Sequence, residues 1–301
     1  MGRTHLITGA HGFSGRQIAR ALIERGHEVR TLTNSAGDDS LAQSIDTRPL
    51  DFEDLPALER AFEGVDVFYN TYWVRFAAAG FDQEVAVGRS AELFRCASLA
   101  GVRRIVHVSI THPDQASPWA YFRGKARIEA ALRASGVPHS ILRPAVVFGS
   151  GDILINNIAW LLRRFPVFGI FGDGRYRLRP IHVDDLAQLA ASEGQAQRNR
   201  VIDAVGPESF EYRELVAMLA KTLERQPRWV RLSPWLGHVA ARALGAWVGD
   251  VVLTREEIGA LMDGLLDTAG PATGSTLLST WAHENRAKLG RDYANEVARR
   301  R

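Results

Sequence analysis

Residues 8–15 read Thr-Gly-Ala-His-Gly-Phe-Ser-Gly, and this stretch decides the fold. Its three glycines are three residues apart, between a strand-like run at 3–8 and a segment with apolar residues at helical spacing. In such a unit the first glycine permits a tight turn, the second lets the backbone approach a pyrophosphate, and the third lets the helix pack near its strand. Amides at the helix start, aided by the helix dipole, then bind the phosphates. A plain structural turn is the alternative, but we expect NAD or NADP to bind at Gly9, Gly12, Phe13, Ser14 and Gly15.

The first half of the chain alternates short apolar runs with helical patterns. Strands are expected at 3–8, 27–33, 45–50, 65–70, 104–109 and 140–148. Helices are expected after Gly15 and at 55–62, 83–100 and 120–135. This alternation predicts an α/β fold, a Rossmann-type doubly wound parallel sheet with helices on both faces.

The pattern changes after Gly149. A helix at 153–165 precedes a stretch at 166–179 that looks irregular, and a helix at 183–193 leads to a strand at 201–204. We expect a dinucleotide-binding Rossmann domain at 1–149 and 183–204, and a smaller, mostly helical C-terminal substrate lobe at 150–182 and 205–301. Four tryptophans of that lobe are interpreted as core packing: Trp229, Trp235, Trp247 and Trp281.

Composition excludes several classes of function. The net charge of +3 is too small to indicate nucleic-acid binding. A single cysteine, Cys96, rules out an internal disulfide, and the scattered histidines show no metal-ligand spacing, so no metal site is expected. Apolar stretches at 153–162 and 236–252 are interrupted by polar residues and do not reach the roughly 18 residues of a membrane span. We therefore expect a cytoplasmic protein with a small-molecule substrate, no membrane contact and a possible homo-oligomeric state.

Tyr121 and Lys125 stand four residues apart in the helix expected at 120–135, so their side chains share a face. A protonated lysine nearby stabilises phenolate and lowers the tyrosine pKa from its ordinary value near 10, which suits proton transfer at neutral pH. The spacing alone is common on exposed helices. Its position after a dinucleotide fingerprint and the fifth strand favours a catalytic pair.

Further motifs extend this pattern to about residue 220. They are Asp51-Phe52, Leu142-Arg143-Pro144 with Phe148-Gly149, the run Arg-Pro-Ile-His-Val-Asp-Asp-Leu-Ala at 179–187, Asp203-Ala204-Val205-Gly206-Pro207 and Glu214-Leu215-Val216. Together with the glycine turn and the Tyr–Lys pair, they resemble the short-chain dehydrogenase/reductase superfamily. The resemblance is to its extended and atypical branches, which include the NAD-dependent epimerase/dehydratase group and NAD(P)-binding proteins similar to a complex I accessory subunit.

The resemblance implies a role for each matching residue. Asp51 would contact the adenine amino group with Phe52 beside the ring, and Lys125 would also bind the nicotinamide ribose. Tyr121 would exchange a proton with the substrate oxygen during hydride transfer, and Thr111, or else Ser109, would orient that oxygen. The other cofactor contacts are expected where strands end, at Thr33, Asn34, Asn70, Thr71, Tyr72 and Pro144.

Two features leave alternatives open. The second strand is followed by Thr33-Asn34-Ser35, without the acid that binds the ribose 2′-hydroxyl of NAD, so we favour NADP over NAD although no arginine replaces that acid. Only ten residues separate Thr111 from Tyr121, as in atypical members that bind the cofactor without known chemistry, and Tyr72-Trp73 could form a substrate wall or fill the site. The leading hypothesis is an NAD(P)-dependent oxidoreductase or epimerase/dehydratase acting on a small carbonyl or hydroxyl substrate. The alternative is a non-enzymatic redox sensor, like the NmrA-type regulators, or a stabilising subunit.

Overall fold

A computed structural model describes residues 3–35, 37, 40–73 and 82–299. The chain forms two compact units. Unit 1 combines Met1–Pro144 with Val183–Ala204, and unit 2 combines Ala145–His182 with Val205–Arg301. The first boundary lies at Pro144 rather than Gly149, because the residues that follow Pro144 leave the large sheet and pair within unit 2.

Unit 1 is built on one parallel sheet of seven strands, so the predicted doubly wound fold is confirmed. The strand order is β11-β6-β5-β4-β1-β2-β3. The strands are β1 (Thr4–Thr8), β2 (Glu28–Leu32), β3 (Ile45–Arg48), β4 (Val67–Asn70), β5 (Arg104–Val108), β6 (His139–Pro144) and β11 (Arg200–Ala204). The order reverses between β1 and β4, and in open parallel sheets a ligand binds beyond the carboxyl ends of the strands at that reversal.

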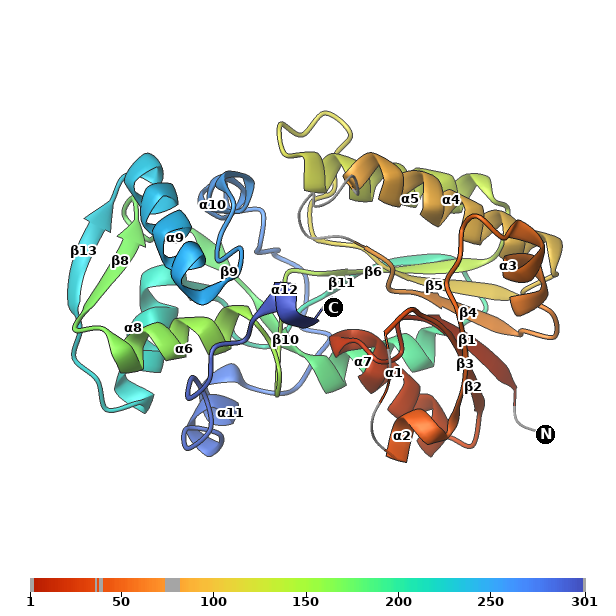
Figure 1. The fold of residues 1–301 in the computed structure, drawn as a ribbon, viewed down its shortest axis with the longest axis horizontal. Helices are drawn as coiled ribbons and strands as arrows, with labels where there is room; N and C mark the ends of the chain where they lie inside the picture. The colour runs from red at the N-terminus through yellow and green to blue at the C-terminus, as the bar shows by residue number, and fades with distance from the viewer. Residues whose placement is uncertain (1–2, 36, 38–39, 74–81, 300–301) are drawn as a thin grey trace. The chain divides into compact units, whose positions relative to one another are not determined.

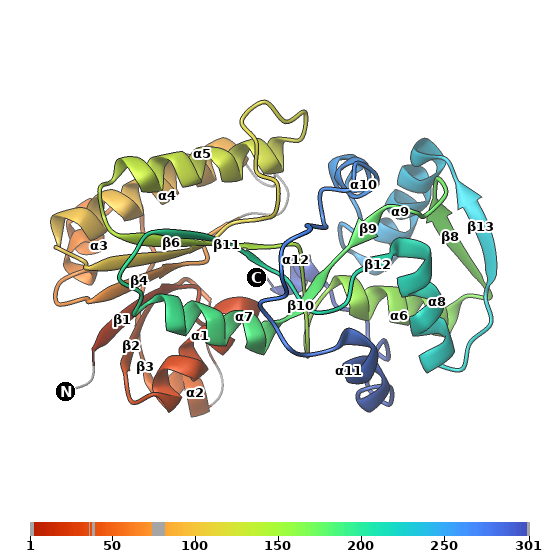
Figure 2. The ribbon, with the colours of Figure 1, turned by 180° about the vertical axis from the view of Figure 1, so that it is seen from behind.

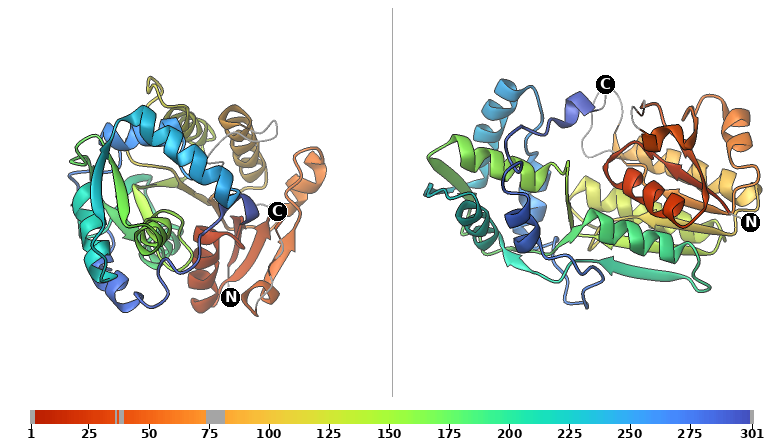
Figure 3. Two further views of the ribbon diagram at one scale, coloured as in Figure 1. Left: turned by 60° about the vertical axis from the view of Figure 1, so that its left-hand side comes forward. Right: turned by 90° about the horizontal axis from the view of Figure 1, so that it is seen from below.

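Helices cover both faces of this sheet, as Figures 1 and 2 show. One face carries α3 (Leu55–Ala61), α4 (Gln83–Leu99) and α5 (Ala120–Ala134). On the other face α1 (Phe13–Glu24) and α7 (Val183–Glu193) lie side by side, as seen from below in Figure 3, and the short α2 (Ser40–Gln43) precedes β3. Apolar side chains of the sheet, α3, α4 and α5 form a continuous core, in which Cys96 is 1% exposed as expected for a small buried hydrophobe.

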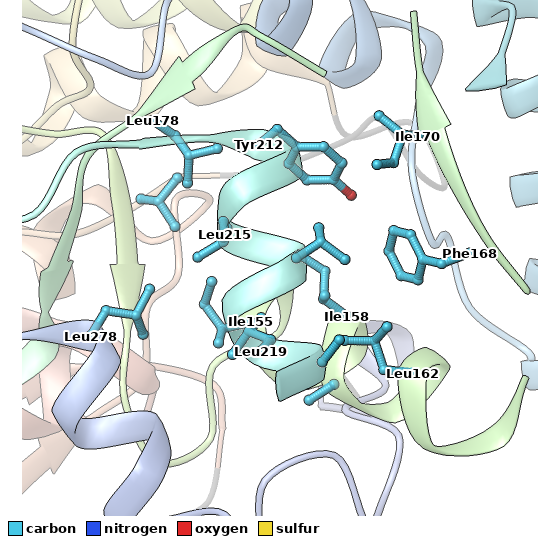
Figure 4. Close-up of a cluster of buried hydrophobic side chains, with 14 of the residues drawn as sticks. Ile155, Ile158, Leu162, Phe168, Ile170, Leu178, Tyr212, Leu215, Leu219 and Leu278 are labelled. Atoms are coloured by element: carbon cyan, nitrogen blue, oxygen red, sulfur yellow. The ribbon is translucent and has the colours of Figure 1, made fainter. Parts of the chain in front are cut away.

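Unit 2 contains the helices α6 (Leu154–Arg164), α8 (Tyr212–Thr222), α9 (Pro234–Val248), α10 (Arg255–Met262), α11 (Leu278–Glu284) and α12 (Glu296–Arg299). Three strand pairs accompany them: β7 (Val146–Phe148) with β10 (Pro180–His182), β8 (Val167–Phe171) with β13 (Arg228–Leu232), and β9 (Arg177–Leu178) with β12 (Phe210–Glu211). Figure 4 shows the core, where Tyr212 of α8 points toward Ile170 and Phe168 of β8, and Leu215 and Leu219 of the same helix belong to the same apolar cluster. Among the described residues, no helix combines the length and apolar character that crossing a bilayer requires.

Two expectations from the sequence were wrong. The strand expected at 140–148 is two strands, because β6 pairs with β5 and β11 in unit 1 whereas β7 pairs with β10 in unit 2. The stretch 166–179 is not irregular, since it contains β8 and β9 joined across glycines with positive φ at Gly172 and Gly174. The partner of β8 is β13, some 60 residues later, so no local pattern indicated the pairing.

Candidate functional site

The glycine turn has the geometry of a phosphate cradle. Gly9 leaves β1 with φ +70°, a conformation that side chains disfavour, and its amide donates to the Leu32 carbonyl at 2.9 Å. The next turn is closed by the amide of Gly12, which donates to the Gly9 carbonyl at 2.9 Å. Gly12 is the N-cap of α1 and provides no side-chain cap, so the first-turn amides of the helix face outward without a capping group. Such a helix start suits a pyrophosphate.

Gly15 lets α1 pack directly on this turn. A Cβ atom at this position would lie 2.2 Å from the Gly9 carbonyl oxygen and 2.8 Å from the Gly9 carbonyl carbon. Both of these neighbours are backbone atoms, so a side-chain rotation cannot relieve the overlap. The turn and the helix therefore hold each other in place only when residue 15 is glycine.

The side chains at the ends of β2 and β3 are already engaged within the protein. The Asn34 carboxamide donates to the Leu50 carbonyl and accepts from the Leu50 amide, both at 3.0 Å. The Thr33 hydroxyl accepts from the amide of Ser35 at 3.1 Å, and a carboxylate oxygen of Asp51 accepts from the amide of Glu53 at 2.9 Å. These bonds fix the shape of the edge at which adenosine is expected.

Phe52 belongs to an aromatic–cation cluster that the sequence did not reveal in full. Its ring lies 5.5 Å from that of Tyr72, and the guanidinium of Arg89, from α4, lies 4.7 Å above it. Arg89 also donates to the Tyr72 hydroxyl at 3.3 Å, while burial raises the pKa of Tyr72. The cluster joins the ends of β3 and β4 to α4 and gives the expected adenine side a flat, cationic wall.

The end of β4 is organised by a buried polar network. Asn70 is fully buried; its amide nitrogen donates to His107 Nδ1 at 3.2 Å, and its carbonyl accepts from the Thr8 hydroxyl and from the amide of Tyr72. The Thr8 hydroxyl accepts from the amide of Thr71 at 2.9 Å. Burial and the nearby Lys125 hold the pKa of His107 well below its ordinary value, so its ring is neutral. Asn70 thus positions the backbone of residues 71 and 72.

Tyr121 and Lys125 lie in α5 beside Trp73. The Lys125 ammonium donates to the Val108 carbonyl at 2.9 Å and lies 4.7 Å from the Trp73 ring, and the Tyr121 ring meets the same indole edge-on at 5.1 Å. Gly124 makes room for the indole, because a Cβ there would lie 2.6 Å from the Trp73 ring. The bulky residue after β4 therefore packs against the expected catalytic pair.

Glu129 engages Ser109, one of the two candidate hydroxyls for orienting a substrate oxygen. Ser109 is buried and donates its hydroxyl to the Glu129 carboxylate at 2.7 Å, and Arg143 binds the same carboxylate through two nitrogens at 2.9 and 2.6 Å. Although burial opposes it, hydrogen bonds from Arg143 and Ser109 lower the pKa of Glu129, so the group is a carboxylate. The Ser109 hydroxyl is therefore engaged within the protein, and the orienting role of Thr111, or else Ser109, stays a prediction.

Burial lowers the pKa of Lys125 to about 7, with Glu129 acting in the opposite direction. An unfolded lysine titrates near 10.4, so between pH 7 and 10.4 the unfolded state binds more protons and stability rises with pH, by at most about 1.4 kcal/mol per pH unit. Below pH 7 both states are protonated and the full penalty persists. We expect Lys125→Met to be more stable than wild type at pH 7, by an amount that shrinks toward pH 10.

Urea unfolding at about pH 6, 7, 8.5 and 10 measures the stability difference between Lys125→Met and wild type, because these values cover the range between the folded and unfolded pKa of the lysine. Lys221→Met is the matched control, because Lys221 is exposed on α8, and its stability difference should not change over the same range. If the stability difference between Lys125→Met and wild type also does not change with pH, the interpretation of Lys125 as a buried lysine with a lowered pKa is contradicted.

The sheet topology brings the predicted residues to one edge. Gly9, Thr33, Asp51 and Thr111 follow carboxyl ends of parallel strands in unit 1, and Asn70 and Pro144 are the last residues of β4 and β6. The Pro144 carbonyl accepts from the Thr111 amide at 3.1 Å. Sequence reasoning missed Arg89, His107 and Glu129. Only the spacing of Glu129, four residues after Lys125, signalled a side chain on the same helix face. The assigned roles of all these residues stay predictions.

Comparison with known proteins agrees with this geometry. Residues 9–151 match the family model described as NAD(P)H-binding. The NADH dehydrogenase [ubiquinone] 1 alpha subcomplex subunit 9 of Arabidopsis thaliana is 23% identical over 241 residues, which are 75% of this chain and 59% of that protein. The chain thus spans less than two thirds of that relative. The ceramide reductase of Caulobacter vibrioides is 28% identical over 248 residues, 80% of this chain and 77% of that protein.

Among solved structures, the triphenylmethane reductase of Citrobacter sp. complexed with NADP(H) has a TM-score of 0.75 at 16% identity. The alignment covers 94% of this chain and 99% of that one, and at this identity it shows the fold. The family match covers the glycine turn, the polar network after β4 and the Tyr–Lys helix, all within unit 1. Residues 9–151 are therefore similar to NAD(P)H-binding proteins, and the solved structure confirms the Rossmann-type fold of the chain.

Proposed function

We propose that this protein is an NAD(P)-dependent oxidoreductase, or an epimerase/dehydratase that works by transient hydride transfer, on a small carbonyl or hydroxyl substrate. The observation that carries the proposal is the position of Lys125, which lies one helical turn after Tyr121 in α5. Its side chain is buried and its Nζ donates to the Val108 carbonyl. Support comes from the ceramide reductase relative, whose name states a reduction. The cytoplasmic location, a substrate-side role for unit 2 and a homo-oligomeric state stay predictions.

The cofactor fits the residues present, because the cradle that Gly15 leaves open would be closed by a single Cβ atom. The first-turn amides, from Phe13 to Gly15, would bind the pyrophosphate, and Phe52 would lie beside the adenine. A bound nicotinamide supplies or accepts a hydride. The protein's own part would be to hold the cofactor and to carry the proton at the Tyr121 hydroxyl.

In the direction of reduction, Tyr121 donates its hydroxyl proton to the substrate oxygen as that oxygen gains negative charge. Lys125, when protonated, stabilises the phenolate that remains, and Thr111 orients the substrate oxygen by a hydrogen bond. Oxidation runs the same proton transfer in reverse. Glu129 and Asn70 act only through other groups, by holding Ser109 and the backbone after β4.

A second candidate function is non-enzymatic cofactor binding, as a redox sensor or a stabilising subunit. The Trp73 indole favours it, because this ring lies against both Lys125 and Tyr121, where a substrate would have to approach. The Arabidopsis relative, which is named as a subunit, also favours it. The two functions differ in one measurement, hydride transfer between bound nicotinamide and a panel of carbonyl compounds. Turnover that depends on Tyr121 supports the enzyme, and tight binding without turnover supports the alternative.

We expect NADPH to bind more tightly than NADH, because no acid at the end of β2 repels a 2′-phosphate. Titration calorimetry with both cofactors measures the two dissociation constants. Thr33→Asp should shift the preference toward NADH by about tenfold, since it places a carboxylate where the ribose 2′-position is expected. Aspartate can also accept the Ser35 amide bond that Thr33 accepts now, so the turn should persist. NADH binding to wild type about fivefold tighter than NADPH, roughly 1 kcal/mol, contradicts the preference.

A further inference from the structure

Helix α9 of unit 2 is built with its small residues inward. Its buried positions are Gly237, Ala241 and Gly245. A Cβ at Gly237 would lie 2.2 Å from the Phe171 ring, and one at Gly245 would lie 2.5 Å from the carbonyl oxygen of Asp250. The helix therefore lies close against β8 and the loop after its own C-terminus, and its large side chains have no place on that side. A helix that only completed a core would have its large apolar side chains on the buried face and its small or polar residues on the exposed face.

The outward face of α9 carries the large apolar side chains. Trp235 is 71% exposed and Trp247 is 66% exposed, and Leu236 and Val239 lie between them in the sequence, also exposed. The interpretation of these tryptophans as core packing was wrong for Trp235 and Trp247, and also for Trp229 of β13, which is 47% exposed. Few soluble proteins leave two such large rings in water on one helix without a binding partner.

The apolar face continues beyond the helix. The Trp247 ring lies 6.4 Å from that of Phe165, which directly follows α6, and Figure 1 shows α9 beside β8 and β13. Exposed apolar side chains of these neighbouring segments are Phe165, Val167 and Val230; Trp229, although exposed, projects from the opposite face of β13, where its ring lies 6.1 Å from that of Phe168. We call the surface of Phe165, Val167 and Val230, with Trp235, Leu236, Val239 and Trp247, the tryptophan face.

The segment that contains β13 and α9 is basic, with Glu224 and Asp250 directly outside it. Residues 225–249 contain four arginines and no aspartate or glutamate, and all four arginines are exposed: Arg225, Arg228, Arg231 and Arg242. Arg164, also exposed, lies 5.0 Å above the Trp160 ring at the end of α6. Exposed aromatic and aliphatic side chains on a segment whose charged residues are arginines match an apolar layer bordered by anions.

We propose that the tryptophan face binds the surface of an anionic lipid bilayer, with α9 lying in the plane of the interface. The apolar side chains would enter the boundary between headgroups and acyl chains, where tryptophan is favoured, and the arginines would meet lipid phosphates. At 15 residues, α9 is about 22 Å long, shorter than the roughly 30 Å of a bilayer core, so it does not span. This proposal departs from the expectation of no membrane contact, which was argued only from the lack of a spanning segment.

A second copy of this chain is a poorer partner for the same face. In a symmetric dimer the same patch faces itself, so the arginines of residues 225–249 would approach one another without a carboxylate from that stretch to pair with. Phosphate groups of lipids supply the missing negative charge, and arginine binds them in a planar, two-point geometry. Charge complementarity therefore favours the bilayer.

Vesicle flotation of the full-length protein tests the proposal. We expect wild type to float with vesicles that contain phosphatidylglycerol, to float weakly with pure phosphatidylcholine, and to be released by high salt. Trp235→Ala/Leu236→Ala removes apolar area and should weaken binding about tenfold or more. Arg228→Gln/Arg231→Gln removes two charges and should weaken it by at least about tenfold. The matched control is Leu99→Ala on α4 of unit 1, where Leu99 is 67% exposed, and it should float like wild type.

Flotation results that differ from these expectations overturn the proposal. Wild type that does not associate with anionic vesicles at low salt excludes a bilayer partner, as does unchanged flotation of the Trp235→Ala/Leu236→Ala variant. Analytical ultracentrifugation is run on the same proteins. If wild type self-associates and this variant is monomeric, while neither floats, the tryptophan face is an interface between copies. Thermal unfolding and NAD(P)H titration confirm that the variants are folded.

Discussion

Replacing Gly15 with alanine is expected to abolish measurable binding of NAD and NADP. The added Cβ would lie 2.2 Å from the Gly9 carbonyl oxygen, 2.8 Å from its carbonyl carbon and 3.2 Å from the Ala10 Cα. Because these are backbone atoms, either α1 must move away from β1 or the turn must open, and both displace the amides that bind the diphosphate. We expect the dissociation constant to rise at least about 100-fold, or about 2.7 kcal/mol, as measured by fluorescence or calorimetric titration.

Gly88→Ala is the matched control for this substitution. Gly88 lies in α4, where an added Cβ would meet no atom within 4 Å. Alanine in a helix interior is more stable than glycine by up to about 1 kcal/mol, so this variant should bind the cofactor like wild type and unfold at the same or a higher temperature. If Gly15→Ala binds either dinucleotide within about threefold of the wild-type affinity, roughly 0.7 kcal/mol, the phosphate cradle is assigned to the wrong place.

The parts of the fold that could be predicted from the sequence are those fixed by local patterns. The strand–turn–helix unit around Gly9 and the alternation up to Pro144 depend on periodicity and on glycines at helix ends, which short windows of sequence contain. The pairing of β8 with β13 and the split between β6 and β7 depend on partner strands that are distant in the chain. Local patterns in the sequence therefore could not predict either feature. The orientation of α9 was missed for a related reason, because both of its faces are apolar and only the contact of Gly237 with Phe171 shows which one is inside.

The candidate site shows the same division. The Tyr–Lys spacing predicted two side chains on one face of a helix, and α5 provides that helix. The sequence did not reveal that the Ser109 hydroxyl is engaged, because the Glu129 carboxylate that accepts its hydrogen bond lies 20 residues later, in α5. Similarly, the packing of Trp73 on Lys125 depends on the absence of a side chain at Gly124, a fit that exists only in three dimensions.

Tyr121→Phe is expected to remove turnover while leaving cofactor binding intact. Phenylalanine keeps the ring and its edge-on contact with Trp73 at 5.1 Å, so the substitution deletes only the hydroxyl that would carry the proton. Without this donor, the developing charge on the substrate oxygen loses its acid, and we expect kcat to fall by about 1000-fold, or about 4 kcal/mol. The rate is followed by absorbance of the reduced nicotinamide with a panel of aldehydes and ketones, and the dissociation constant of NADPH should change less than about twofold.

Tyr72→Phe distinguishes loss of the proton donor from loss of any hydroxyl near the cofactor. The Tyr72 hydroxyl accepts from Arg89 at 3.3 Å on the expected adenine side, so its removal should weaken cofactor affinity modestly and leave kcat nearly unchanged. Equal kcat values for Tyr121→Phe and wild type exclude proton transfer by Tyr121. If wild type binds NADPH but turns over none of the carbonyl compounds, Trp73 fills the space beside Tyr121 rather than bordering a substrate, and the chain acts by binding. A Trp73→Ala variant that then gains turnover would show that the indole alone separates the two functions, because Lys125 and Tyr121 are already in place in α5.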